Sequence, residues 1–214
     1  MVKNGKMLFI FLSALFILNC AGTTSMMKEP IEGKNLIIGS IIFENNGKNN
    51  RNEVFFDNLE VAIMGYYEEN AKEKVFGKWI YTDENGYFFI PNVPAGRYAV
   101  KAIRVNMSGQ SFITVANEFR TMVDNYKLSP ENIAFSGTYF DTRPTERIVN
   151  LKHNYFTIFP NSEIRYGSYD MIAEFTASNG EKISRPLIFK YFIEKYPETG
   201  WNEYLNKVLS TYKQ

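Results

Sequence analysis

Hydrophobic and polar positions alternate with a period of two along several short runs in the first half of the chain. In one of them, Tyr98, Val100 and Ala102 form an apolar row that alternates with the residues between them. Successive side chains of a strand point to opposite faces, so this period predicts half-buried β-strands. We assign such strands to residues 36–43, 59–65, 78–81, 87–90, 98–103 and 111–115. Aromatic residues make up 16% of the chain, which also favours strands. The sequence therefore predicts a mainly β protein.

A run of turn-forming residues separates the strands at 78–81 and 87–90. Asp83 and Asn85 mimic a backbone turn with their side chains, and Gly86 accepts a positive φ. Such a turn between two aromatic, β-branched runs predicts a hairpin. Pro94 ends the second strand because it has no N–H to donate, and Gly96 turns the chain again.

The same turn also resembles half of an EF-hand calcium loop. That loop needs a bidentate glutamate at its twelfth position, and this position, counted from Asp83, is Pro94. We therefore interpret residues 83–86 as a plain hairpin turn.

Residues 82–100 form a longer pattern of turn and strand positions. Its members are Thr82, Asp83, Gly86, Phe88, Ile90, Val93, Pro94, Gly96, Tyr98 and Val100. In order and spacing they resemble the carboxypeptidase regulatory-like (prealbumin-like) β-sandwich superfamily. The resemblance covers residues 36–116 and implies an antiparallel β-sandwich, but it implies no chemistry, since one fold hosts many functions. The residues that carry the fold motif are Asp83, Gly86, Pro94, Gly96 and Tyr98.

Tyr98 follows the Pro94–Gly96 turn closely, and two interpretations stay open. Its hydroxyl bonds back to the backbone of that turn, as in the tyrosine corner of immunoglobulin-type sandwiches, or it is a core aromatic with a hydrated hydroxyl.

The second half of the chain changes character twice. Residues 117–183 contain weakly alternating runs at 133–140, 147–151, 154–159 and 169–176, and we expect these strands to extend the same domain. Residues 184–214 predict a short helical tail of two helices. The first would begin at an N-cap, Ser184, with Pro186 in its first turn, and Thr199 would cap the second. The apolar positions at helical spacing are Leu187, Ile188, Tyr191, Phe192, Trp201, Tyr204, Leu205, Val208 and Leu209. These faces either pack on the sandwich or dock another protein.

The chain begins with features of an export signal. Lys3 and Lys6 precede an apolar run at 7–18, which is too short to cross a bilayer comfortably. With Ile17 three positions before it, Cys20 resembles the acylated cysteine of a bacterial lipoprotein. Asn19 directly before the cysteine departs from the commonest lipobox and resembles the relaxed lipobox of spirochaetes. The rival interpretations are an uncleaved N-terminal anchor and ordinary secretion.

The lipoprotein interpretation fixes the organisation of the N-terminal region. Residues 1–19 form the signal peptide, and lipidation (palmitate among the acyl groups) falls on Cys20. Residues 20–35 are small and polar and are expected to form a flexible tether. Ala21 is not the aspartate that retains lipoproteins in the inner membrane of enteric bacteria, so the resemblance implies the outer membrane of a bacterial cell envelope.

Candidate chemistry is sparse. The formal net charge is +1 without a basic stripe, which argues against a nucleic-acid partner. There is one cysteine and one histidine, His153, so we expect no metal, no cofactor and no catalytic site. We interpret His153 as a surface residue of a strand. An enzyme would instead need acidic residues that converge in a pocket with shifted pKa values.

The sequence thus predicts a non-catalytic, membrane-anchored lipoprotein whose β-sandwich is an interaction or structural module. Its expected partners are the membrane, through Cys20, and an envelope protein that contacts the C-terminal helices. The alternative is a lipoprotein that binds a carbohydrate or another small molecule on exposed aromatic side chains such as Trp79, Tyr66 and Tyr67.

Overall fold

A computed structural model describes eleven stretches of the chain: residues 27–46, 52–55, 59–107, 110–115, 118–121, 140–141, 147–158, 164–169, 175–176, 182–183 and 187–212. The predicted signal peptide at 1–19, the lipidation site Cys20 and the first part of the predicted tether lie outside these residues. So does most of the run predicted as a strand at 133–140.

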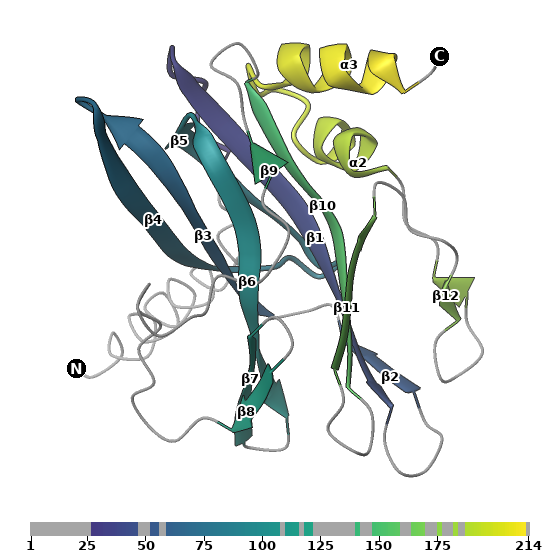
Figure 1. Cartoon of the computed structure of the whole chain (residues 1–214). Coiled ribbons are helices and arrows are strands. Elements are labelled where there is room, and N and C mark those ends of the chain that lie inside the picture. Colours follow the sequence, from purple (N-terminus) through teal and green to yellow (C-terminus); the bar gives the residue numbers. More distant parts are fainter. Residues whose placement is uncertain are drawn as a thin grey trace, which may run out of the picture.

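Two main β-sheets form the body of the protein (Figure 1). The first sheet contains β1 (Lys34–Asn46), β2 (Asn52–Phe55), β5 (Tyr87–Pro94), β10 (Ile148–Ile158) and β11 (Ile164–Tyr169) in the order β11-β10-β1-β2, with β5 also paired with β1. The second contains β3 (Glu60–Glu69), β4 (Lys72–Tyr81), β6 (Gly96–Met107), β7 (Gln110–Val115), β8 (Glu118–Thr121) and β9 (Phe140–Asp141) in the order β4-β3-β6-β7-β8, with β9 also paired with β6. A separate pair consists of β12 (Phe175–Thr176) and β13 (Lys182–Ile183).

The prediction of a mainly β sandwich with a short helical tail is confirmed. One strand pair departs from the antiparallel pattern, because β10 runs parallel to β1, with Ile37 opposite Val149 and Phe43 opposite Phe156. Every other pair among the described residues is antiparallel.

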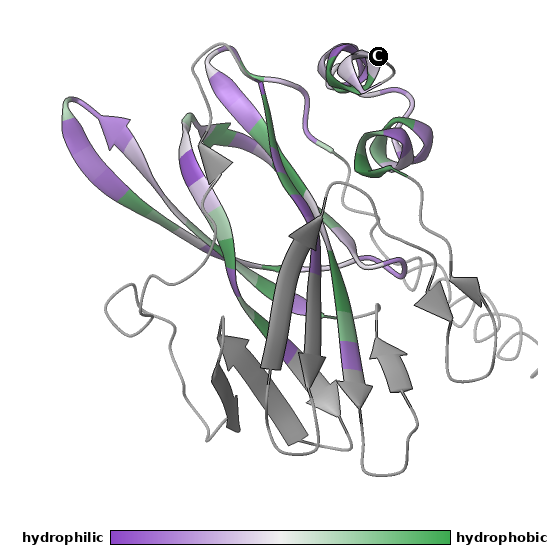
Figure 2. Cartoon of the chain, turned by 45° about the vertical axis from the view of Figure 1, so that its right-hand side comes forward, coloured by the Kyte–Doolittle hydropathy of each residue, from purple (hydrophilic) through white to green (hydrophobic). Residues whose placement is uncertain are grey.

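The sandwich core lies between the two sheets and follows the predicted alternation. It contains Ile37, Ile41, Phe43, Leu59, Val61, Ile63, Phe88, Ile90, Val93, Tyr98, Val100, Ile103, Val149 and Leu151. Figure 2 shows how hydrophobic and hydrophilic positions alternate along these strands. Since each fully buried aliphatic side chain contributes about 1.5–3 kcal/mol, this core dominates the stability of the body.

The runs predicted as separate strands at 147–151 and 154–159 belong to one strand, β10. Its pairing with β1 shifts where Gly39 faces both Leu151 and Lys152, and Lys152 has a φ of 61°. Such a bulge adds a residue and reverses the alternation beyond it, which is why the sequence pattern suggested an interruption.

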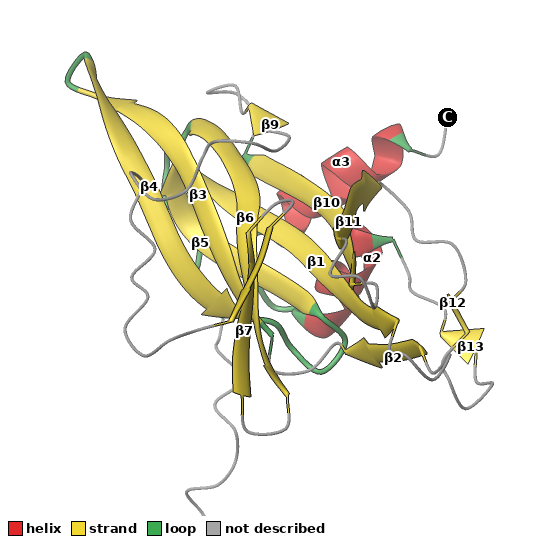
Figure 3. Cartoon of the chain, turned by 60° about the horizontal axis from the view of Figure 1, so that its bottom comes forward, coloured by secondary structure: helices red, strands yellow, loops and turns green. Residues whose placement is uncertain are grey.

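The outer face of the first sheet is covered by two helices, α2 (Ile188–Lys195) and α3 (Asn202–Thr211), seen against β1 and β10 in Figures 1 and 3. A second core lies beneath them and contains Met27, Leu36, Ile38, Tyr87, Ile148, Ile188, Phe189, Phe192, Trp201 and Leu205. The apolar helix faces therefore pack on the sandwich, which was the first of the two interpretations.

The helix ends differ from the predicted ones. The N-cap position of α2 is Leu187, so the helix begins after Pro186 and Ser184 does not cap it. The start of α3 is closer to the prediction, because the backbone N–H of Trp201 donates to Thr199 Oγ1 at 3.4 Å, although the helix itself begins at Asn202.

Candidate functional site

The hairpin turn at Asp83 is built as the sequence predicts. Asp83 Oδ1 accepts the backbone N–H groups of Asn85, at 3.0 Å, and Tyr87, at 2.9 Å. The N–H of Gly86 donates to the Asp83 carbonyl at 2.8 Å, and Gly86 has a φ of 75°. These bonds use one carboxylate oxygen of Asp83 to close the turn.

The remaining motif residues form a tyrosine corner. The Tyr98 hydroxyl donates to the carbonyl of Pro94 at 2.5 Å, so the first of the two interpretations of Tyr98 is correct. Burial raises the pKa of this phenol far above its ordinary value. Gly96 sits where a Cβ would lie only 2.2 Å from the backbone oxygen of Tyr66, so the close approach of β6 to β3 requires a glycine here.

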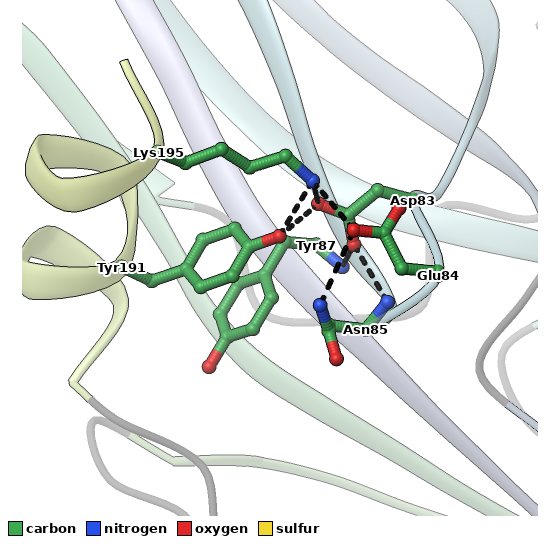
Figure 4. A network of polar contacts seen from close by, with 6 residues as sticks. All are labelled: Asp83, Glu84, Asn85, Tyr87, Tyr191 and Lys195. Atoms are coloured by element: carbon green, nitrogen blue, oxygen red, sulfur yellow. Dashed lines mark hydrogen bonds and ion pairs between the residues drawn. The ribbon is translucent and has the colours of Figure 1, made fainter. Parts of the chain in front are cut away.

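The second oxygen of Asp83 joins the turn to α2 (Figure 4). Asp83 Oδ2 accepts a hydrogen bond from the Tyr191 hydroxyl. The same oxygen forms an ion pair with Lys195 Nζ, at 2.7 Å. Lys195 also reaches Glu84 Oε1 at 3.1 Å and the Tyr191 hydroxyl at 2.8 Å. Asp83 therefore holds the turn with one oxygen and the helical tail with the other.

The ionisation of this network follows from its partners. Burial, and then the hydrogen bond to Asp83, raise the pKa of Tyr191 to about 12. Burial by itself would lower the pKa of Lys195, but its bonds with Asp83, Tyr191 and Glu84 outweigh burial and raise that pKa. Lys195 is therefore a stable cation at neutral pH, and the network is a structural clamp between the turn and α2.

His153 is buried, which corrects the prediction that it lies on the surface. It sits on β10 beside β1, and its Nδ1 lies 2.6 Å from the hydroxyl oxygen of the buried Ser40. The rings of His153 and Tyr87 also pack edge to face, with their centroids 6.0 Å apart. The sequence could not nominate this serine because the register that joins the two residues is set by the parallel pairing of β1 and β10. Both members are shielded from solvent, so the pair serves packing under α2.

Two further points concern metal and proton chemistry. Among the described residues, no group of three or more potential metal-ligating side chains comes together.

Lys101 lies at a bulge of β6. The register between β3 and β6 shifts there, so that Lys101 is one residue more on β6 than on β3, and its side chain is buried. Burial lowers the pKa of Lys101 to about 8.

Part of the predicted tether lies against the folded domain. Met27 is buried, the indole Nε1 of Trp201 donates to the Lys28 carbonyl at 2.8 Å, and the Gly200 N–H donates to Glu29 Oε2 at 2.9 Å. Residues 27–34 are thus a docked segment rather than free chain, because the fully buried Trp201 on the helical tail provides a site for them.

Arg147 fastens the other end of the docked segment. Its Nε donates to the Lys34 carbonyl at 2.7 Å and another guanidinium nitrogen donates to the Ile31 carbonyl at 2.6 Å. The same guanidinium lies over the rings of Trp201, at 5.3 Å, and Tyr204, at 4.7 Å. Arg147 therefore links residues 31–34 to the helical tail.

The aromatic residues expected to bind a ligand lie on β3 and β4. Tyr66, Tyr67 and Trp79 are all half-buried, and Arg104 lies over the Trp79 ring, 4.4 Å from its centroid. The most exposed aromatic residue of these two strands is Tyr81, which the sequence did not single out and which has 65% of its surface exposed. Its position two residues after Trp79 on the same strand was the available signal, since such residues share a face.

Comparison with known proteins leaves the family open. No protein-family model matches the chain, and no curated protein matches it. Among solved structures, the chain is similar to a 9R-lipoxygenase from Cyanothece, at 15% identity and a TM-score of 0.23. The match covers 71% of this chain and 20% of the lipoxygenase chain. The TM-score is too low for any conclusion about fold or function. Within the described part of the chain, no helix combines the length and the apolar character needed to cross a membrane.

Proposed function

We propose that this protein is a non-catalytic lipoprotein of a bacterial cell envelope, anchored by acyl chains on Cys20, with the outer membrane as its location. Its β-sandwich serves as an interaction or structural module. The observation that carries the proposal is the N-terminal sequence, in which Lys3 and Lys6 precede an apolar run at 7–18 and Cys20 follows shortly after that run.

The docked segment shortens the distance between lipid and domain. Cys20 lies seven positions before Met27, so the intervening chain bridges at most about 25 Å when extended. A single acyl chain binds membranes only weakly, whereas the two or three chains of a bacterial lipoprotein hold it permanently. The folded body would therefore stay close to the membrane surface.

The described polar groups support a structural role. Ser40 and His153 bond to each other in a buried layer, and Asp83 and Lys195 clamp the tail to the sandwich. These contacts join distant elements of the chain to one another. An envelope protein would contact the outward faces of the helices, where Lys190 and Glu194 are largely exposed.

Fractionation of envelopes combined with mass spectrometry tests the proposal. We expect the wild-type chain in the membrane fraction, with an N-terminal peptide that begins at an acylated Cys20. The variant Cys20→Ala should keep its signal peptide and lack the acyl mass, whereas Ser25→Ala, in the same region, should behave as wild type. An unacylated Cys20 in the mature wild-type protein would overturn the proposal.

The expected protein partner has a separate test. A photo-crosslinking residue placed at Glu194, on the outward face of α2, should capture a reproducible envelope protein in cells. The same residue placed at Val75, on the far sheet, is the matched control. Equal products from the two positions, or none from Glu194, would remove the helical tail as the interaction surface.

A further inference from the structure

A row of three polar and aromatic residues crosses the outer face of the second sheet. The register places Tyr81 of β4 opposite Glu60 of β3, and Glu60 opposite Arg104 of β6. Leu59 and Val61, the neighbours of Glu60, point into the sandwich core, so Glu60 points away from it. The row therefore lies on the side of the sheet away from the core.

The next row supports the first. It contains Trp79, Ala62 and Ala102 in register. Because Ala62 between them is small, the Arg104 guanidinium reaches across it to lie 4.4 Å from the centroid of the Trp79 ring. This cation–π contact fixes Arg104 while its NH1 pairs with Glu60 Oε2.

The polar groups of the row keep unused hydrogen-bonding capacity. A guanidinium has five N–H donors. NH1 of Arg104 pairs with Glu60, its Nε–H is buried without an acceptor among the described residues, and 22% of its side chain is exposed to a ligand. Glu60 is an acceptor, and its hydrogen bond is the main reason why the pKa of the Tyr81 phenol is raised. Tyr81 itself presents an aromatic face to solvent, being 65% exposed.

These features match the chemistry of one ligand class. A pyranose ring has an apolar C–H face that packs on an aromatic ring, and hydroxyl groups that both donate and accept. Tyr81 offers the ring, Glu60 the acceptor and Arg104 the donor. The charges of Glu60 and Arg104 cancel, so nothing in the row favours an anionic or a cationic ligand.

We infer that Tyr81, Glu60 and Arg104 form a binding site for neutral glycans on the outer face of the second sheet, with Trp79 as the residue that positions Arg104. A hexose unit lies on the Tyr81 ring, one of its hydroxyls donates to the Glu60 carboxylate and a neighbouring hydroxyl accepts from Arg104. The site does not depend on acylation of Cys20.

Calorimetric titration of the full-length chain tests the site. The protein carries Cys20→Ala and is kept in a detergent without a sugar head group, so neither lipid nor detergent competes. The probes are cellotetraose and chitotetraose as neutral glycans, and tetragalacturonate as an anionic one. We expect at least one neutral probe to bind with a dissociation constant below about 1 mM and to bind more tightly than the anionic probe.

Four variants locate the binding. Tyr81→Ala and Glu60→Gln should each weaken binding by about tenfold or more, because one removes the ring and the other the charged acceptor. Val75→Ala is the matched control, since Val75 is an exposed residue of the same strand. Tyr81→Trp keeps an aromatic surface and should retain binding.

Each outcome decides the proposal. Loss in Tyr81→Ala and Glu60→Gln with retention in Val75→Ala and Tyr81→Trp supports it. Failure of both neutral probes to bind at millimolar concentration, tighter binding of the anionic probe, or unchanged binding by Tyr81→Ala overturns it. Because Tyr81 is largely exposed, Tyr81→Ala should keep the wild-type thermal midpoint, and this is checked first.

Discussion

Tyr191 of α2 stacks on Tyr87 of β5, with ring centroids 3.8 Å apart and planes inclined by 13°. Stacked pairs of this kind add about 0.5–1.5 kcal/mol beyond the area that they bury. The Tyr191 hydroxyl donates at the same time to Asp83, which begins the turn that leads into Tyr87. One helical residue thus secures the C-terminal tail to the central hairpin through both its ring and its hydroxyl.

Removal of the charged clamp should loosen the tail. Lys195→Met keeps the length of the side chain but breaks the ion pair with Asp83, whose other oxygen still closes the turn. Lys195 is largely buried, so we expect a loss of about 1–3 kcal/mol in the free energy of unfolding, measured by urea denaturation. Hydrogen exchange should accelerate most in α2.

Lys190→Met is the control for this change. Lys190 lies on the same helix, and its ion-pair partner among the described residues is Glu194. Both side chains are largely exposed, so its loss should cost less than about 0.5 kcal/mol. Equal destabilisation by the two variants would contradict the clamp.

The clamp also marks the limit of what the sequence predicts. The turn at Asp83 and the corner at Tyr98 follow from local chemistry, because the hydrogen bonds that close them join residues no more than four positions apart. Tyr191 lies 108 positions from Asp83, and only the packing of α2 on the first sheet brings them together. The pairing of Ser40 with His153 is unpredictable for the same reason.

Strand direction and exposure are harder still to predict. Alternation indicates which residues share a face, but it cannot tell that β10 lies parallel to β1 and is covered by helices. His153 was expected at the surface because a lone histidine on a strand is most often a surface residue, while its burial is decided by elements distant in the chain. The polar composition of residues 27–34 likewise did not indicate that this segment docks against Trp201.

The tyrosine corner should be measurable by removing one atom. Tyr98→Phe keeps the ring in the core but leaves the Pro94 carbonyl without its donor. We expect a loss of about 1 kcal/mol in the free energy of unfolding and a lower thermal midpoint. Tyr212→Phe removes a hydroxyl from a ring that is 46% exposed and should change neither. A wild-type midpoint in Tyr98→Phe would show that the corner contributes nothing to stability.

Release of the docked segment should expose it to protease. Trp201→Phe loses the hydrogen bond to the Lys28 carbonyl and part of the apolar contact with Met27. We expect trypsin to cleave after Lys28 several-fold faster than in the wild-type chain, because proteases act on chain that has left the folded surface. Cleavage is followed by mass spectrometry of the released peptide.

An internal reference separates local release from global unfolding. Lys101 is buried in β6, so cleavage after it requires the sheet to open. In Trp201→Phe the ratio of cleavage at Lys28 to cleavage at Lys101 should rise, whereas Trp79→Phe, on the other sheet, should leave it unchanged. An equal rise at both lysines would mean that Trp201 stabilises the whole body rather than the docked segment.

Lys101 should also give the protein an unusual dependence of stability on pH. Burial lowers its pKa to about 8 in the folded chain, against 10.5 for the ordinary side chain. Between these two values the unfolded chain holds a proton that the folded chain has released, so the free energy of unfolding rises with pH. At about 1.4 kcal/mol for each pKa unit, the gain is at most about 3.5 kcal/mol.

Above pH 10 the free energy of unfolding should fall as pH rises, and this reversal defines the test. The pKa of Tyr191 is raised to about 12 from 10.0, so the unfolded chain loses this proton first and stability falls as pH rises further. Urea midpoints measured from pH 7 to 11 should therefore increase from about 8 to about 10 and then decrease. Lys101→Met, which removes the charge but keeps the volume, should abolish the increase. Lys78→Met, an exposed lysine of β4, should retain it. If Lys101→Met shows the same increase as the wild-type chain, another group causes it and Lys101 is not held neutral by the fold.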